Sequence, residues 1–269
     1  MNIPAFSICA VAMLTISPIA AQAASGYTLA VVLAHADDES PIGPALARYA
    51  REGVHVYLII ATDGARGFGP TRSPDIAGAN SQNLAGIRGD EARCATGELG
   101  AEPPVLLGFP DGKLGDYPDD KGLLFRLTEQ LVAALERIRP DAIVTWGPDG
   151  GYGHPDHRVV SSITTQLVRA GAPGTTERLF YMTIPAEAMR ALYPNRAEPS
   201  WLTPLSKYFA VRVPFEVQDA NAARRAMACH RSQFTDEMVQ SATTAGVRAW
   251  ADGVRLIPAD PAKTDVFAK

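Results

Sequence analysis

The feature that most constrains the fold is a regular alternation of short apolar segments with longer segments of helical periodicity. Strand-like runs occupy Tyr27–Ala34, Val54–Ala61, Val105–Phe109, Ala142–Trp146, Arg178–Thr183 and Tyr208–Val213. Helix-like segments occupy Pro41–Glu52, Asn83–Leu99, Leu123–Arg139, Asp156–Arg169 and Val217–His230. Strands that are apolar throughout and alternate with helices predict a parallel sheet covered on both faces. We therefore expect an α/β, Rossmann-like three-layer fold with a mostly parallel sheet.

The composition and the absence of breaks indicate one domain. Hydrophobic residues make up 46% of the 269 residues, enough for a large core. No internal repeat or low-complexity tract divides residues 24–269, and the Pro-rich stretch from Pro185 to Pro204 reads as a surface excursion. The net charge is 25 − 29 = −4, which gives no polybasic surface for nucleic acid. We expect a single domain over residues 24–269 that does not bind nucleic acid.

The first 23 residues have the pattern of a secretory signal peptide. The run Ala5–Ile16 is largely apolar, Pro18 interrupts it, and Ala21-Gln22-Ala23 fits a small-x-small cleavage site. The alternative is a membrane anchor, but the run is shorter than the ~20 apolar residues of a spanning helix. The start of the segment lacks Lys and Arg, which is atypical of a signal peptide. We expect a periplasmic or secreted protein with no membrane span once residues 1–23 are removed.

Two cysteines remain in the expected mature chain. Cys94 and Cys229 can pair in an oxidising compartment, and two buried thiols fit the sequence equally well. No Cys-x-x-Cys or Cys/His zinc spacing is present. Cysteine therefore contributes nothing to a metal site.

Polar residues follow four of the predicted strands at the points where they end. In parallel sheets, ligands bind beyond the carboxyl ends of the strands. Those ends are followed by His35-Ala36-Asp37-Asp38-Glu39, Thr62–Gly67, Pro110-Asp111-Gly112 and Gly147–His157. We expect these four segments to meet and to form the active site on one edge of the sheet.

The residue types at this edge favour a metal site. His154 and His157 lie three residues apart, and Pro155 is well placed as the first helical residue, so the pair would lie on one face of the helix's first turn. Two histidines and one aspartate give zinc three ligands and leave a position open for water. The second aspartate of the Asp37-Asp38 pair could then take a proton from that water. Alternatively both aspartates merely cap the next helix, although capping requires only one of them.

Two motifs together carry a family resemblance. "AHADDE" (Ala34–Glu39) and "GHPDH" (Gly153–His157) resemble the PIG-L / LmbE-like family of zinc-dependent N-deacetylases, which includes GlcNAc-inositol and GlcNAc-malate deacetylases. The first motif is usually AHPDDE, and Ala36 replaces its proline here. "TDGARG", the Arg88/Glu91 pair, "LGFPDG" and "HRSQ" match further family motifs in order and spacing. The resemblance extends across most of the chain.

The resemblance implies a role for each matching residue. The zinc ligands would be His35, Asp38 and His157, and the general base would be Asp37. His154 would stabilise the charged tetrahedral intermediate and help to protonate the departing amine. The remaining roles fall to Tyr152, which polarises the carbonyl, to Arg88 and Asp111, which contact the sugar, and to Asp156, which orients a histidine. For Arg88 the alternative is a helix-surface ion pair with Asp90 or Glu91.

The expected protein is an exported hydrolase with one Zn²⁺ per chain, for which Fe²⁺ could substitute. It would remove the N-acetyl group from an N-acetylated amino sugar or glycoconjugate. One alternative is a hydrolase of another amide or an acyl ester on the same fold. A second is a non-haem iron oxygenase using His35-Ala36-Asp37, although such enzymes usually have a jelly-roll fold. A third is a carbohydrate-binding protein without activity, against which an intact Asp37 argues.

Overall fold

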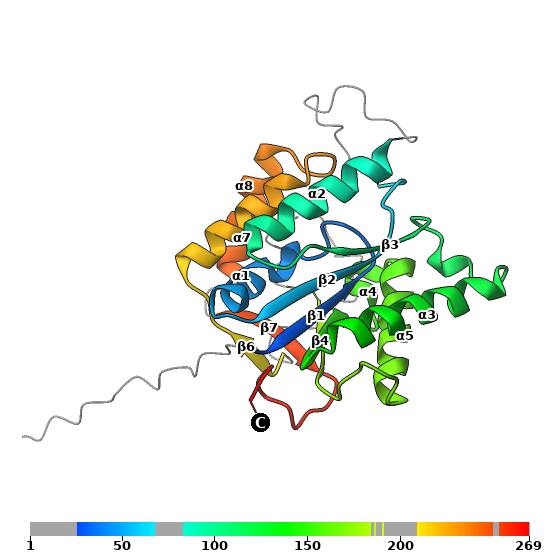
Figure 1. Cartoon of the computed structure of the whole chain (residues 1–269). Helices are drawn as coiled ribbons and strands as arrows, with labels where there is room; N and C mark the ends of the chain where they lie inside the picture. The colour runs from blue at the N-terminus through cyan, green and yellow to red at the C-terminus, as the bar shows by residue number, and fades with distance from the viewer. Residues whose placement is uncertain are drawn as a thin grey trace, which may run out of the picture.

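The computed structural model describes residues 26–67, 83–183, 186, 190, 209–249 and 253–268. The predicted signal peptide and nearly all of the stretch from 185 to 204 lie outside the described residues. Within them, the strands form one sheet in the order β3-β2-β1-β4-β5-β7-β6 (Figure 1). Their bounds are β1 Thr28–Leu33, β2 His55–Thr62, β3 Val105–Phe109, β4 Ala142–Trp146, β5 Leu179–Met182, β6 Val211–Val213 and β7 Val254–Pro258.

The sheet is parallel from β3 to β5 and antiparallel at β7 and β6. β1 pairs in parallel with β2 on one side and with β4 on the other. β7 runs antiparallel to both of its neighbours, β5 and β6. This arrangement confirms the prediction of a mostly parallel sheet.

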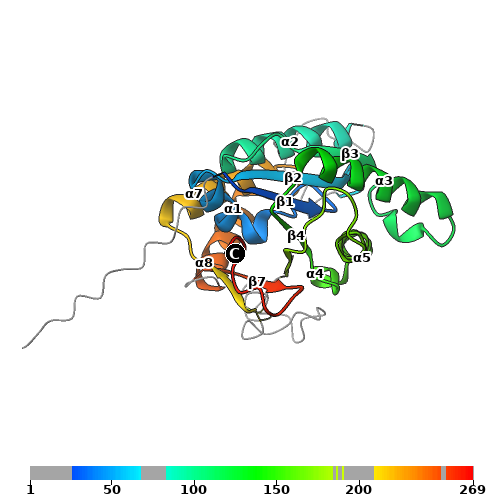
Figure 2. The ribbon, with the colours of Figure 1, turned by 60° about the horizontal axis from the view of Figure 1, so that its bottom comes forward.

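Helices cover both faces of the sheet (Figures 1 and 2). One face carries α1, α2 and α7, with α8 packed against α7, and the other carries α3 and α5. The helix bounds are α1 Gly43–Arg51, α2 Leu84–Leu99, α3 Lys121–Ile138, α4 Gly150–Gly153, α5 Pro155–Arg169, α7 Val217–Cys229 and α8 Asp236–Ala249, with 3₁₀ turns η1 Ser40–Ile42 and η2 Leu114–Asp116. Among the described residues, no helix combines the length and the apolar character needed to cross a membrane.

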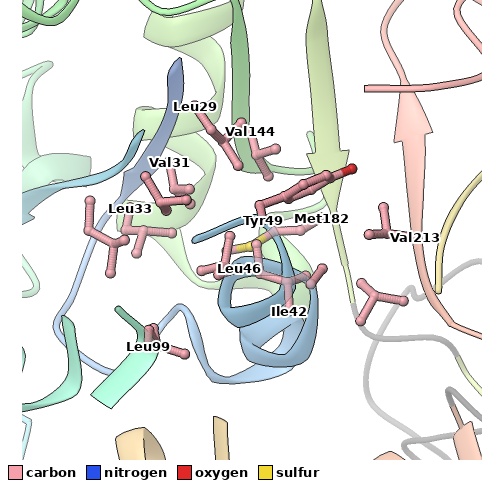
Figure 3. Packing of buried hydrophobic residues seen from close by; sticks show 14 of the residues in the cluster. Leu29, Val31, Leu33, Ile42, Leu46, Tyr49, Leu99, Val144, Met182 and Val213 are labelled. Carbon is pink, nitrogen blue, oxygen red and sulfur yellow. The ribbon is translucent and has the colours of Figure 1, made fainter. Parts of the chain in front are cut away.

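Alternating residues of β1 fill two separate cores. Leu29, Val31 and Leu33 belong to the cluster on the α1 side, which Figure 3 shows together with Leu46, Leu99 and Val144. The intervening β1 residues pack in a second cluster with α3 and α5. Because successive side chains of a strand point to opposite faces, a strand buried on both sides must be apolar at every position. This is why the β1 sequence shows no polar alternation.

The order of the strands places a topological switch point between β1 and β4. From β1 the chain moves outward to β2 and β3, whereas β4 and β5 extend the sheet in the opposite direction. Such a switch point leaves a gap between the carboxyl ends of the two adjacent strands, where ligands bind in sheets of this type. His35 follows β1, and the Gly147–His157 segment follows β4. The fold therefore brings the two candidate metal motifs together.

The structure differs from the sequence prediction mainly after β4. Strand β7 and helices α4 and α8 were not predicted, and the predicted strand Tyr208–Val213 begins only at Val211 among the described residues. β7 lies toward the edge of the sheet with alternating burial, so it lacks the continuous apolar run of the central strands. The predicted helix Pro41–Glu52 begins as a 3₁₀ turn and becomes an α-helix at Gly43.

Cys94 and Cys229 form a disulfide with their Cα atoms 5.8 Å apart. Cys94 lies on α2, and Cys229 is the last residue of α7. The structure thus decides between the two alternatives that the sequence left open. The bond links α2, which carries Arg88, to α7, which ends directly before His230.

Candidate metal and catalytic site

Three side chains converge where β1 and β4 end. His35 Nδ1 lies 3.0 Å from His157 Nε2, which lies 3.1 Å from Asp38 Oδ1, and the third side of the triangle, from His35 Nδ1 to Asp38 Oδ1, is 3.7 Å. A tetrahedral zinc ion with bonds of about 2.0–2.1 Å separates its ligand atoms by roughly 3.3 Å. The triangle fits the face of such a tetrahedron, and all three side chains are buried.

Hydrogen bonds leave the facing nitrogen of each histidine with its lone pair. His157 Nδ1 lies 3.0 Å from the Gly150 carbonyl oxygen, which can only accept, so Nδ1 carries the proton. His35 Nε2 lies 3.1 Å from Asp111 Oδ1 and 3.3 Å from Asp156 Oδ2, so its proton is on Nε2. The nitrogens that face Asp38 are therefore unprotonated in the neutral rings, as a metal ligand requires.

The environment of His35 favours a positive charge at this site. Burial alone would lower the pKa of His35, but Asp38, Asp111 and Asp156 together raise it well above the ordinary value. Three carboxylates around one imidazole are unfavourable without a compensating charge. A divalent cation would provide that charge.

Three hydrogen-bond donors orient the Asp38 carboxylate by binding one of its oxygens. Its Oδ2 accepts hydrogen bonds from the backbone N–H of Ala34 at 3.0 Å and of His35 at 2.8 Å. The indole N–H of Trp146 donates to the same oxygen at 3.0 Å. These contacts hold Oδ1 toward the two histidines.

Trp146 is a site residue that the sequence reasoning missed. Its ring stacks on His157 with centroids 4.3 Å apart and planes 6° apart, while its N–H binds Asp38. Gly151 has φ +71°, and a Cβ there would lie 2.5 Å from the Trp146 ring, so the loop needs glycine at this position. The available signal was a tryptophan as the last residue of the buried strand that leads into the Gly-rich metal motif.

We expect Trp146→Phe to weaken metal binding by ~10–100-fold, because such hydrogen bonds to metal ligands typically have effects of this size. Phenylalanine keeps the aromatic stack on His157 and removes only the donor to Asp38. Competition against a chromophoric chelator measures the zinc affinity. An affinity equal to that of the wild type would show that the Trp146 hydrogen bond does not orient Asp38.

Arg88 is buried against the carboxylate of Asp37. Its Nη2 lies 3.3 Å from Asp37 Oδ2 and also donates to the Ala36 carbonyl, and its Nη1 donates to the Gly67 carbonyl at 3.3 Å. A Cβ on Gly64 would collide with the Arg88 side chain, which explains one glycine of "TDGARG". The alternative of a surface ion pair for Arg88 was therefore wrong, since the side chain is only 3% exposed.

The pKa values of the two adjacent aspartates are shifted in opposite directions. Burial raises the pKa of Asp37, and the Arg88 guanidinium offsets only part of that rise. Burial acts on Asp38 too, but His157 and His35 hold its pKa well below the ordinary value. A pair of carboxylates with separated pKa values is the usual arrangement when one is an anionic ligand and the other exchanges protons.

His154 and Tyr152 border the site on the α4 side. The backbone N–H of Asp156 donates to His154 Nδ1 at 3.2 Å, and burial, with His35 and His157 nearby, lowers the pKa of His154 to about 4. His154 is therefore neutral at pH 7 with its proton on Nε2. Burial raises the pKa of Tyr152, so its hydroxyl stays protonated. Its ring lies edge-on to His157, with centroids 5.1 Å apart.

Two other groups could also contribute metal ligands. Ligand atoms of His35, His154 and His157 lie within 4.8 Å of one another, as do those of His35, Asp111 and Asp156. In the second group, however, both oxygens of Asp156 already accept backbone N–H groups, Oδ2 that of Gly112 and Oδ1 that of Leu114. The three donors to Asp38 all bind Oδ2 and leave Oδ1 for the metal. We therefore favour the group that contains Asp38.

The chain matches known proteins in both sequence and structure. The PIG-L family model, described as GlcNAc-PI de-N-acetylase, matches residues 30–168, a range that includes both metal motifs. A 1D-myo-inositol 2-acetamido-2-deoxy-alpha-D-glucopyranoside deacetylase of Rhodococcus opacus is 36% identical over 186 residues, which are 61% of this chain and 63% of that protein. The match thus spans less than two thirds of this relative's length.

Two solved structures share the fold. The conserved protein TT1542 of Thermus thermophilus aligns with a TM-score of 0.59 at 25% identity, over 87% of this chain and 94% of that one. GalB, the 4-carboxy-2-hydroxymuconate hydratase of Pseudomonas putida, aligns with a TM-score of 0.58 at 19% identity, over 90% and 100% of the two chains. The second likeness shows the fold alone. The family match covers more than half of the chain and contains both metal motifs, so this chain belongs to the PIG-L family.

Proposed function

We propose that this protein is a metal-dependent hydrolase that removes the acetyl group from an N-acetylated amino sugar or glycoconjugate. The observation that carries the proposal is that the neighbouring carboxylates of Asp37 and Asp38 have different contacts and oppositely shifted pKa values. Asp38 faces two histidines, and its pKa is lowered. Asp37 lies beside Arg88, and its pKa is raised. A metal ligand next to a proton acceptor is the arrangement required for hydrolysis by activated water.

His35, Asp38 and His157 would hold the metal, and zinc suits this donor set of two imidazoles and a carboxylate. Fe²⁺ is compatible with the same ligands. The bound metal would polarise the amide carbonyl and make water acidic enough to attack at neutral pH. The neutral tautomers fixed by Gly150, Asp111 and Asp156 support this choice of ligands.

Asp37 takes the proton of the attacking water in the proposed reaction. The raised pKa makes its carboxylate a better base than an ordinary aspartate, and Arg88 keeps the carboxylate in place. Asp37 then returns the proton to the nitrogen as the C–N bond breaks. The products are the free amine and acetic acid, which loses its remaining proton to solvent and leaves as acetate.

His154 and Tyr152 would stabilise the negative charge that develops on the carbonyl oxygen. Both are neutral donors at pH 7, one through Nε2–H and the other through its hydroxyl. A neutral imidazole is a poor source of protons, so the proposal assigns protonation of the amine to Asp37. Direct contact of Arg88 and Asp111 with the sugar stays a prediction, because their described hydrogen bonds orient Asp37 and His35.

The substrate class rests on the family and on the relative named above. We expect protein loaded with zinc to release acetate and a free amine from at least one member of a panel of N-acetylated sugars. The panel would include N-acetylglucosamine, its inositol glycoside and chitobiose, and a chelator should abolish the release until zinc is restored. Release of acid from acyl esters but from no acetamido sugar would favour the alternative of an esterase.

The fold by itself does not decide the reaction, since the hydratase named above shares it. The iron oxygenase alternative loses support for a different reason. It assigned Asp37 as the ligand beside His35, but the carboxylate that faces both histidines is that of Asp38. A parallel α/β sheet is also unlike the jelly roll of those enzymes.

We also propose that the protein is exported, to the periplasm or beyond. The apolar run, Pro18 and the Ala21-Gln22-Ala23 motif support removal of residues 1–23. The disulfide between Cys94 and Cys229 adds support, because such bonds persist mainly in oxidising compartments. N-terminal sequencing of protein from its native host tests this proposal, and an intact Met1 on the soluble protein would contradict it.

A further inference from the structure

Asp37 adopts a backbone conformation that needs an explanation. Its φ is +96°, in the region that non-glycine residues rarely occupy. Such a conformation is energetically unfavourable and persists only when surrounding contacts enforce it. The residue before Asp37 is Ala36, which has no ring to restrict the backbone of this turn. Other contacts must therefore hold the turn.

Two charged side chains hold the peptide group between Ala36 and Asp37. Its carbonyl accepts a hydrogen bond from the Arg88 guanidinium, and its N–H donates to Glu39 Oε2 at 3.1 Å. A flip of this peptide would bring Asp37 to negative φ. It would also point the carbonyl at the Glu39 carboxylate and the N–H at Arg88, and both contacts would be repulsive. The two side chains therefore select the positive φ.

Glu39 is itself held from the far end of the chain. Its Oε1 lies 2.7 Å from His230 Nε2, and both side chains are buried, at 2% and 0% exposure. The carboxylate thus has one oxygen for Asp37 and the other for His230. His230 Nδ1 has no hydrogen-bond partner among the described residues, so the contact with Glu39 is the polar contact that positions this ring.

The segment that presents His230 is anchored on both sides. Cys229, directly before it, is bonded to Cys94 on α2. Ser232, two residues after it, donates its N–H and hydroxyl to the Glu91 carboxylate at 2.6 and 2.7 Å. Helix α2 therefore fixes the His230 segment. The "HRSQ" motif thus supplies both the histidine that contacts Glu39 and the serine that anchors this segment.

We propose that Glu39, held by His230, is a positioning residue that keeps the Ala36–Asp37 peptide in the orientation in which Asp37 acts as base. The proposal rests on the proposed function for the role of Asp37. It adds two residues to the catalytic apparatus, neither of which touches the substrate. It also assigns a function to the glutamate of "AHADDE" and to the histidine of "HRSQ".

The test compares Glu39→Ala with Glu39→Gln. We expect Glu39→Ala to lower kcat by ~10–100-fold with little change in KM or zinc content, because a misplaced catalytic group costs rates of this order. Glutamine should recover most of kcat. Its amide oxygen can accept from Asp37, and its NH₂ can donate to His230 Nε2 once that ring carries its proton on Nδ1. Equal kcat values for Glu39→Ala and the wild type would overturn the proposal.

A matched control removes another buried carboxylate from the same side of the sheet. Asp219, near the start of α7, is 2% exposed and binds Arg51 through two hydrogen bonds of 2.8 and 3.0 Å. Asp219→Ala should lower stability and leave kcat unchanged. A fall in kcat as large as that of Glu39→Ala would mean that both act through general loss of stability, and would overturn the proposal.

A crystal structure of Glu39→Ala separates this inference from the proposed function. We expect Asp37 to leave positive φ in that variant through a flip of the Ala36–Asp37 peptide. If φ stays near +96°, the proposal fails whatever the protein hydrolyses. If the peptide flips but the wild-type protein deacetylates no sugar, the positioning role holds and the proposed function fails.

Discussion

Replacing Asp37 with alanine is expected to lower kcat/KM by ~10²–10⁴-fold, the usual cost of losing a general base, while zinc still binds. Asp37 is paired with Arg88 and lies outside the triangle formed by His35, Asp38 and His157. Its removal therefore leaves all three ligand atoms in place. Metal analysis of the dialysed variant, together with its steady-state kinetics, measures both expectations.

The variants for comparison are Asp38→Ala and His157→Ala, which remove proposed metal ligands instead of the proposed base. Each removes one ligand atom of the triangle, so both should lose zinc affinity as well as activity. Asp37→Asn, which keeps the shape of the side chain, should be as inactive as Asp37→Ala because its amide cannot accept the proton. If Asp37→Ala lost its metal and Asp38→Ala kept it, the roles within the pair would be reversed.

The central part of the fold could be predicted because its signals are local and strong. A strand such as β1, buried on both faces, must be apolar at every position, and the sequence shows this directly. β7 could not be recognised in the same way. Its burial alternates along Val254–Pro258, and its antiparallel pairing depends on partners far away in the chain. Five residues of mixed character carry too little information about such pairing.

The candidate site was predictable where a residue type implies its own chemistry. Histidines and aspartates after strand ends pointed to a metal, and the fold brings His35, Asp38 and His157 within a few ångströms. The residues that orient them were not predictable in the same way. The Gly150 carbonyl and the Trp146 indole act through hydrogen bonds that exist only once β1, β4 and α4 are assembled. Any residue supplies a carbonyl, and a buried tryptophan usually signifies only packing.

Arg88 also shows what the sequence alone could not predict. Its spacing from Glu91 on α2 allowed a surface ion pair, because residues three or four apart on a helix lie on the same face. The side chain instead turns inward to Asp37 and Gly67. Helical spacing defines the neighbours of a residue on its own helix. It does not determine which face of that helix the rest of the fold will cover.

Loss of the disulfide between Cys94 and Cys229 is expected to lower the free energy of unfolding by about 5 kcal/mol, the value for a loop of this length in the chain-entropy account. The two cysteines are 135 residues apart, so the bond restricts much of the unfolded chain. Urea unfolding of the wild type, with and without a reductant, measures the difference. The double variant Cys94→Ser/Cys229→Ser should match the reduced wild type.

This destabilisation should have little effect on the folded site at 25 °C. The hydrogen bonds from Ser232 to Glu91 and from His230 to Glu39 do not involve the cysteines, so kcat should stay close to that of the oxidised protein. The double variant also provides the control for the reductant, which should not change its unfolding curve. A loss of stability below ~1 kcal/mol would contradict the entropic account, since it would mean that the reduced unfolded chain is already as compact as the cross-linked one.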